Sequence, residues 1–255
     1  MRDLAKKILK NTASRNEVLL YWLGGSGYII KNNIITIGLD IYLSNSCQKA
    51  DEVYKRLVPP PLSPEDIKLD YLIASHSDGD HLDIGSLDKF ISDKTDTKII
   101  GPDSVIKRCK GLGIARERLI RLNRGEKIKI NSLKLKAVFA DHGEISPDCI
   151  GIIIHLSGKN IYFTSDTCYR PDLPELVNLN EKIDLLIVPI NGKYNPDFKD
   201  ASYIAAWVKP EIVIPTHFWM FKEHGGEPGK FVEFCSQVAP GVKILIPAIG
   251  ESIYF

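Results

Sequence analysis

The chain has 255 residues, and 44% of them are hydrophobic, which is enough for a sizeable core within one domain. Its 33 lysine and arginine residues balance 32 aspartate and glutamate residues, so no broad electrostatic attraction to nucleic acid is built in. No run reaches the ~20 apolar residues of a membrane span, and five cysteines, an odd number, suit a reducing compartment. We therefore expect a cytoplasmic protein without nucleic-acid or membrane partners.

The predicted elements begin with a short amphipathic surface helix over residues 1–10. Apolar runs of strand length then recur along the chain, at 18–23, 28–30, 34–37, 71–74, 98–100, 134–139, 150–156, 160–163, 185–189, 211–215 and 243–247. Helical signals lie between them: an N-cap serine and a first-turn proline at 63–66, and two phenylalanines on one face of 227–235. Because no low-complexity linker or internal repeat interrupts this alternation, we predict a single domain over residues 1–255.

The segment that follows the strand predicted at 71–74 is the most informative of the chain. It places His76, Asp78, Asp80 and His81 within six residues at the end of a strand. Imidazole and carboxylate groups suit zinc, manganese or iron better than calcium. The competing interpretation is a polar surface turn that contains two histidines.

Three further ligand-type residues occupy similar positions. His142 follows the strand predicted at 134–139, Asp166 follows the apolar run that ends at Phe163, and His217 follows the run 211–215. Randomly placed side chains would lie on helix faces and in loops as often as at strand ends. The repeated placement therefore indicates one site, assembled from four loops at one edge of a sheet.

Other polar residues have simpler interpretations. His155 lies inside the strand predicted at 150–156, where a packed or surface role is expected. His224 lies in a glycine-rich loop and could touch substrate, although we interpret it as a solvated loop residue. The Gly-Gly-Ser-Gly stretch at 24–27 is interpreted as a tight turn between strands rather than a phosphate cradle. Candidate contacts for an anionic substrate are Lys55, Arg56, Arg170, Lys193 and Lys222.

The order and spacing of the ligand-type residues resemble the metallo-β-lactamase superfamily, whose signature is His-x-His-x-Asp-His followed far downstream by a His, an Asp and a final His. In this chain the pattern falls on His76, Asp78, Asp80, His81, His142, Asp166 and His217. One position departs from it, because Asp78 stands where the second histidine is expected. Short stretches at 22–27, 59–61, 101–102 and 214–221 resemble the group typified by L-ascorbate-6-phosphate lactonase. The implied fold is of the α/β class: an αββα four-layer sandwich of two mixed β-sheets flanked by helices.

The resemblance also implies two divalent metal ions, manganese or zinc, with iron as a further option. The implied ligands form two sets that share one carboxylate: His76, Asp78 and His142, then Asp80, His81 and His217, with Asp166 bridging. A hydroxide between two such ions is activated near neutral pH, and Asp80 is the catalytic candidate that would orient it. The carboxylate of Asp78 is expected to shift the first site from zinc towards a harder ion, or to leave it weaker and partly empty.

These features predict a metal-dependent hydrolase that opens a lactone or a related ester of a phosphorylated sugar acid, such as L-ascorbate 6-phosphate. Because the net charge is close to zero, a local pocket must capture the substrate, which favours a small anion over a polymer. Two alternatives stay open. One is a phosphodiesterase of the same fold, although the basic surface expected of a nuclease is missing. The other is a metal-binding module without turnover, suggested because Asp78 breaks the ligand pattern. A homo-oligomer is compatible with the sequence.

Overall fold

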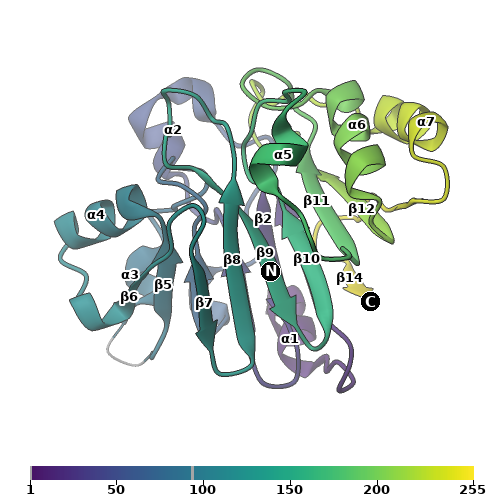
Figure 1. The fold of residues 1–255 in the computed structure, drawn as a ribbon. Coiled ribbons are helices and arrows are strands. Elements are labelled where there is room, and N and C mark those ends of the chain that lie inside the picture. The colour runs from purple at the N-terminus through teal and green to yellow at the C-terminus, as the bar shows by residue number, and fades with distance from the viewer. Residues whose placement is uncertain (1, 93–94) are drawn as a thin grey trace.

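The computed structural model describes residues 2–92 and 95–255. Within these residues, two β-sheets of seven strands each pack together, and helices cover their outer faces (Figure 1). The strand orders are β14-β1-β2-β3-β4-β5-β6 and β13-β12-β11-β10-β9-β8-β7. Each sheet mixes parallel and antiparallel neighbours, so the expected αββα sandwich of two mixed sheets is confirmed.

The N-terminal half of the chain supplies most of the first sheet. Its strands are β1 (Leu19–Gly24), β2 (Gly27–Lys31), β3 (Thr36–Leu39), β4 (Tyr71–Ile73), β5 (Lys98–Gly101), β6 (Leu119–Arg121) and the C-terminal β14 (Ser252–Tyr254). Strands β3 to β6 run parallel, with Ile37 opposite Tyr71 and Leu39 opposite Ile73. The carboxyl ends of β3 and β4 therefore lie side by side at one edge.

The second sheet is built from the C-terminal half. Its strands are β7 (Lys127–Ile130), β8 (Leu133–Phe139), β9 (Ile150–Leu156), β10 (Lys159–Phe163), β11 (Leu185–Pro189), β12 (Ile212–Thr216) and β13 (Lys243–Ile244). Strands β10 to β13 are parallel, and β8 and β10 are both antiparallel to β9. The carboxyl ends of β8, β10 and β12 consequently share one edge, and β8 runs towards the end of the molecule that carries α2 (Figure 1).

Helices form the two outer layers. They are α1 (Arg2–Lys10), α2 (Ser46–Ala50), α3 (Leu87–Phe90), α4 (Asp103–Gly111), α5 (Leu173–Val177), α6 (Phe198–Val208) and α7 (Pro228–Val238), with 3-10 turns at Glu52–Tyr54, Pro64–Asp66 and Arg116–Arg118. The buried side chains of Ile8, Phe90 and Val105 join α1, α3 and α4 to the first sheet. Those of Ile204 and Phe231 join α6 and α7 to the second. In Figure 1, α3 and α4 lie on the left of the molecule, and α6 and α7 lie at the upper right.

The strands at the centre of each sheet are buried on both faces. Ile30 and Ile73 of the first sheet and Ile152 and Ile187 of the second belong to one hydrophobic core and are fully shielded from solvent. A strand covered on both sides carries an unbroken apolar run rather than an alternating one. This explains why apolar runs located the central strands so well.

The differences from the predicted elements lie mainly at the sheet edges and in the turns, although the central strand β3 also begins and ends two residues later than the predicted 34–37. Strands β6, β7 and β14 were not predicted, because edge strands are short and carry polar side chains on the exposed face. The segment 63–66 forms a 3-10 turn, and the Ser63 hydroxyl makes no capping hydrogen bond. Helix α1 confirms the predicted N-terminal helix for residues 2–10, while Met1 lies outside the described residues. Among the described helices, none combines the length and apolar character required to cross a membrane.

Candidate metal centre

The first part of the site is the loop that follows β4. The chain leaves the strand through Ala74 and Ser75, and the Ser75 carbonyl accepts a hydrogen bond of 3.1 Å from the Ile150 amide in the second sheet. His76 and His81 are both buried, and their rings lie 4.0 Å apart. The sheet edge thus fixes the loop and directs two imidazoles inward.

The second sheet contributes three more side chains to the same place. His142 follows β8, Asp166 follows β10 and His217 follows β12, and all three are buried. The ring of His142 lies 5.1 Å from that of His76, and the ring of His217 lies 5.1 Å from that of His81. The four strand ends therefore meet at one edge of the sandwich, as their positions in the sequence indicated.

Asp166 lies between two groups of imidazoles. Its Oδ2 is 3.5 Å from His81 Nε2 and 3.7 Å from His142 Nε2, and its Oδ1 is 3.2 Å from His217 Nε2. A carboxylate with contacts on both sides is in the position expected of a bridging ligand.

Asp78 and Asp80 lie on opposite sides of this centre. Asp78 Oδ2 is 3.4 Å from Nε2 of both His76 and His142, while its Oδ1 accepts a hydrogen bond of 2.7 Å from Ser146 Oγ. Asp80 Oδ2 is 3.7 Å from His81 Nε2, and it is 3.6 Å from Nε2 of His217. The structure thus groups all seven sequence-predicted residues in the two expected sets, and their role as ligands stays a prediction.

The spacing of the donor atoms fits metal ions. Two donors bound to one ion at about 2.1 Å lie about 3 to 3.5 Å apart, close to the separations seen here. His76 Nε2 and Asp166 Oδ1 are buried and form no hydrogen bond with any described residue. His76, His142 and Asp166 form one possible cation-holding group, and His81, Asp166 and His217 form another. The buried clusters therefore suggest a binuclear site that suits zinc, manganese or iron.

The charges of the site are strongly coupled. Burial acts to raise the pKa of Asp166, but His217 and His81 hold it well below its usual range. Burial also acts against a charged His81, yet the carboxylates of Asp166, Asp80 and Asp40 raise the pKa of that imidazole. His81 and these carboxylates therefore favour each other's charged forms, and a cation that binds here would compete with protons for the imidazole.

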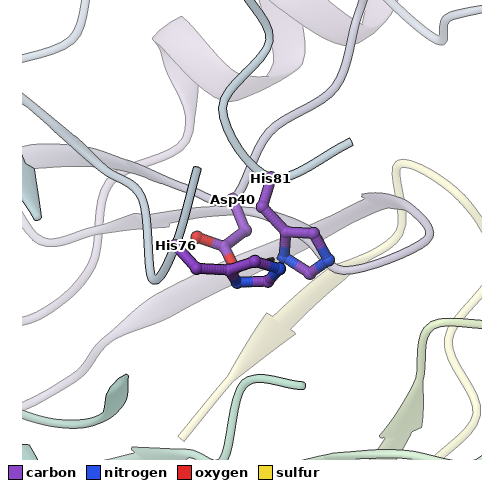
Figure 2. Close-up of side chains that lie close together, drawn as sticks. All are labelled: Asp40, His76 and His81. Atoms are coloured by element: carbon purple, nitrogen blue, oxygen red, sulfur yellow. Dashed lines mark hydrogen bonds and ion pairs between the residues drawn. The ribbon is translucent and has the colours of Figure 1, made fainter. Parts of the chain in front are cut away.

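Asp40, which the sequence analysis missed, supports both histidines of the first loop (Figure 2). It follows β3 and is fully buried; its Oδ2 contacts His81 Nδ1 at 2.6 Å and accepts a hydrogen bond from Ser75 Oγ at 2.5 Å. Ser75 Oγ in turn lies 3.0 Å from His76 Nδ1. With Nδ1 of each ring engaged in this way, both rings present Nε2 to the centre. Its position directly after an apolar strand was the signal that would have identified Asp40.

The turn between β1 and β2 positions His217. The Gly25 carbonyl accepts hydrogen bonds from Trp22 Nε1 at 2.9 Å, from Thr216 Oγ1 at 2.7 Å and from the His217 amide at 3.1 Å. His217 has a φ of +61°, a left-handed conformation that costs a non-glycine residue on the order of 1 kcal/mol or more. The interpretation of 24–27 as a tight turn is confirmed, and the turn also holds one predicted ligand.

The interpretation of His224 as a solvated loop residue is wrong. Its side chain is 12% exposed, and its Nε2 lies 3.7 Å from Asp80 Oδ2. Burial and the neighbouring His217 lower the pKa of His224 to about 4. The alternative, that His224 could touch substrate, agrees with its place in the pocket lining. The sequence favoured the solvated interpretation because His224 lies beyond a strand end, on a loop whose path depends on tertiary contacts. His155, in contrast, is half-buried and pairs with Asn160 at 2.7 Å, which agrees with a packed or surface role.

The centre opens into a pocket of about 520 Å³. The pocket is lined by six acidic and histidine side chains of the centre: Asp78, Asp80, His142, Asp166, His217 and His224. Tyr54, Ile84 and Ile145 provide apolar wall, and Arg108 and Lys193 provide positive charge. Of the five cations considered from the sequence, Lys193 reaches this pocket, whereas the Arg56 guanidinium packs on the Tyr42 ring at 5.0 Å.

The αββα sandwich and the buried His/Asp cluster at its edge together define a protein of the metallo-β-lactamase class. Sequence comparison agrees with this: the family described as "Beta-lactamase superfamily domain" matches residues 46–218. The chain belongs to this family, and the matched range contains all seven predicted ligands.

Similar proteins include two that bear the name UPF0173 metal-dependent hydrolase. The one from Carboxydothermus hydrogenoformans is 25% identical over 240 residues, which cover 91% of this chain and 97% of the relative. The one from Anoxybacillus flavithermus is 28% identical over 203 residues, which cover 75% and 84% of the two chains.

Two solved structures show the same fold. Igni18, a metallo hydrolase from Ignicoccus hospitalis, has a TM-score of 0.73 at 22% identity, covering 94% of this chain and 98% of its own. An isothiocyanate hydrolase from Delia radicum gut bacteria has a TM-score of 0.75 at 17% identity, covering 93% and 99%.

Proposed function

We propose that the protein is a metal-dependent hydrolase of small anionic lactones or related esters, with a phosphorylated sugar-acid lactone such as L-ascorbate 6-phosphate as the preferred substrate. One observation carries this proposal: seven ligand-type side chains converge at one edge of the sandwich, and five of them line a pocket of small-molecule size. The names of the metal-dependent hydrolases among its relatives support the reaction class. The group of L-ascorbate-6-phosphate lactonases, which the sequence resembles, supports the choice of a lactone.

The residues divide the work of such a reaction. His76, Asp78 and His142 would hold one ion, Asp80, His81 and His217 would hold the other, and Asp166 would contribute to both. When bound, divalent ions polarise a carbonyl oxygen and lower the pKa of water towards neutrality. The Asp80 side chain is 20% exposed and lines the pocket, so its carboxylate can orient a water molecule beside the substrate.

The pocket walls support a small substrate with an acidic group. Arg108 and Lys193 place two cations at the pocket, while the formal net charge of the whole chain is only +1. Asp78, Asp80, Asp166 and Glu223 also line the pocket, so the attraction for an anion depends on bound metal ions that would offset these carboxylates. With such ions in place, the two cations would favour a compact anion, and the chain lacks the bulk charge that would attract a polyanion. Tyr54, Ile84 and Ile145 leave room for an apolar ring or chain beside the reacting bond.

A turnover screen tests this proposal directly. With zinc and manganese supplied separately, we expect faster ring opening of a phosphorylated sugar lactone than of its unphosphorylated form, because Arg108 and Lys193 line the pocket. The values of kcat/KM for matched lactones, simple esters, RNA, DNA and bis-phosphodiesters provide the comparison.

Lys193→Gln is the variant that belongs with this screen, since it removes the charge and keeps the length of the side chain. We expect it to reduce the preference for the phosphorylated lactone, whereas Lys129→Gln on the exposed edge strand β7 should leave the preference unchanged. Faster cleavage of a phosphodiester than of any lactone would replace the proposal with the phosphodiesterase alternative. Absence of turnover in the presence of bound metal would favour the metal-binding module.

A second test concerns the unusual Asp78. Because its carboxylate stands where an imidazole is expected, we expect manganese to support higher activity than zinc. Asp78→His should move this preference towards zinc, since the side chain at this position lies 3.4 Å from His76 Nε2 and His142 Nε2. Activity measured after titration of each metal into chelator-treated protein checks the ranking. The same ranking in both proteins would exclude Asp78 as a ligand.

A further inference from the structure

His224 lies against the metal centre, although it falls outside the seven residues of the predicted ligand pattern. Its ring is 4.5 Å from that of His217, and its Nε2 is 3.7 Å from Asp80 Oδ2. His224 Nδ1 is buried, and among the described residues no hydrogen-bond partner for it is found. Asp80, His217 and His224 each offer one ligand atom within a common separation of 4.8 Å.

The relation of His224 to Asp80 matches that of the predicted ligands. His81 Nε2 and His217 Nε2 lie 3.7 and 3.6 Å from Asp80 Oδ2, and His224 Nε2 lies at 3.7 Å from the same oxygen. Donors that share one ion are about 3 to 3.5 Å apart when each bond is about 2.1 Å long, so the contacts of His224 with Asp80 are close to those expected of a shared ion.

The loop holds the ring of His224 in place before any ion binds. The His224 amide donates a hydrogen bond of 3.0 Å to the Phe221 carbonyl, and the His224 carbonyl accepts one of 3.1 Å from the Trp219 amide. The Phe221 ring packs edge-on against the imidazole, with 4.7 Å between the ring centres. At Gly226, which has a φ of +94°, a Cβ atom would come within 2.5 Å of Phe218 Cβ, so this close packing requires glycine. A ring already ordered in this way loses little further entropy on binding an ion.

We propose that His224 is an additional ligand of the metal ion held by Asp80, His81 and His217. The inference rests on the proposed function, because it requires that this site binds metal. With Asp166, the second site would then have five protein donors, more than the four of a tetrahedral structural zinc site. The first site, with His76, Asp78, His142 and Asp166, would have four. The two ions would therefore differ in coordination number and in affinity.

Cobalt(II) alone, added to chelator-treated protein, is the probe for this proposal. Each imidazole bound to cobalt(II) gives a strongly shifted exchangeable N–H signal in the proton NMR spectrum, so the spectrum counts bound histidines. We expect one fewer shifted signal in His224→Ala than in the unaltered protein, and at least about 10-fold weaker binding of one of the two cobalt ions in equilibrium dialysis. His155→Ala is the matched control, because His155 pairs with Asn160 away from the centre, and it should keep the full set of signals.

His224→Gln separates a ligand from a residue that merely donates a hydrogen bond to Asp80. The glutamine amide can still donate that hydrogen bond, so a hydrogen-bonding role predicts that cobalt affinity returns to normal, whereas a ligand role predicts that the lost signal stays absent. The same number of shifted signals in His224→Ala and the unaltered protein would overturn the inference and leave the proposed function intact. Failure of the unaltered protein to bind cobalt at all would overturn both. Circular dichroism and thermal unfolding show whether His224→Ala folds. If it does not, the number of shifted signals in His224→Gln decides whether His224 is a ligand.

Discussion

Asp166→Ala is expected to remove most of the bound transition metal and to lower hydrolysis by at least about 100-fold. Asp166 contacts His81, His142 and His217 at 3.2 to 3.7 Å, so its loss withdraws a donor from both sides of the centre. Loss of a group that only supports a ligand typically costs 10- to 100-fold in affinity or activity, and loss of a shared ligand should cost more. Elemental analysis of protein prepared without chelator should find more than one equivalent of metal in the unaltered chain and much less in the variant.

The control for this experiment is Asp88→Ala. Asp88 lies on α3 with a side chain that is 70% exposed, so its removal should change neither metal content nor turnover. A metal content near zero in the unaltered, metal-supplemented protein would contradict the proposed function as a whole. Retention of both metal equivalents by Asp166→Ala would contradict only the bridging role.

Asp40→Asn is expected to weaken metal binding by about 10- to 100-fold, although Asp40 itself lies behind the ligands. The carboxylate contacts His81 Nδ1 at 2.6 Å and, through Ser75, orients His76. Oδ1 of Asp40 accepts a hydrogen bond from the Ser75 amide, while Oδ2 takes both Ser75 Oγ and His81 Nδ1. An amide has a single acceptor oxygen, so its NH₂ group would face one of these two sets of donors. Competition with a metal-binding dye measures the affinity, and thermal unfolding of the metal-free protein measures the effect on stability.

Asp83→Asn is the matched control, because Asp83 is also a buried carboxylate at the centre of a hydrogen-bond network. It accepts hydrogen bonds from the amides of Leu43 and Ser44 and from the hydroxyl of Ser86. Its substitution should lower the stability of the fold but leave metal affinity close to normal. If both variants lost affinity equally, the effect of Asp40 would be attributed to general destabilisation rather than to orientation of the histidines.

Local sequence pattern predicted the central strands and most of the site for one physical reason. A strand buried on both faces must be apolar throughout, so β4, β9 and β11 stand out, and any polar side chain at the end of such a run is conspicuous. His76 and His217 were found in this way. The parallel directions of neighbouring strands then brought the strand ends together.

The missed parts depend on contacts between segments that are distant in the sequence. β14 pairs with β1 across almost the whole chain, and its three residues carry too little pattern to be recognised alone. His224 reaches the centre because the loop after β12 folds back on itself through the hydrogen bonds of Trp219 and Phe221. Nothing in the glycine-rich sequence around His224 specifies that path. Asp40 was accessible to the same strand-end argument as the other acids, but it lies outside the His-x-His-x-Asp-His signature.

The predicted metal ligands come from both sheets, and this division affects the stability of the whole molecule. His76, Asp78, Asp80 and His81 belong to the half of the chain that forms most of the first sheet, and His142, Asp166 and His217 belong to the half that forms the second. Metal ions bound between these two groups of ligands would form a reversible cross-link between the two sheets. Because such ions bind the folded chain and not the separated halves, their binding free energy would add directly to the cohesion between the sheets. The pocket that admits the substrate would then also be the place where bound metal ions link the two halves of the protein.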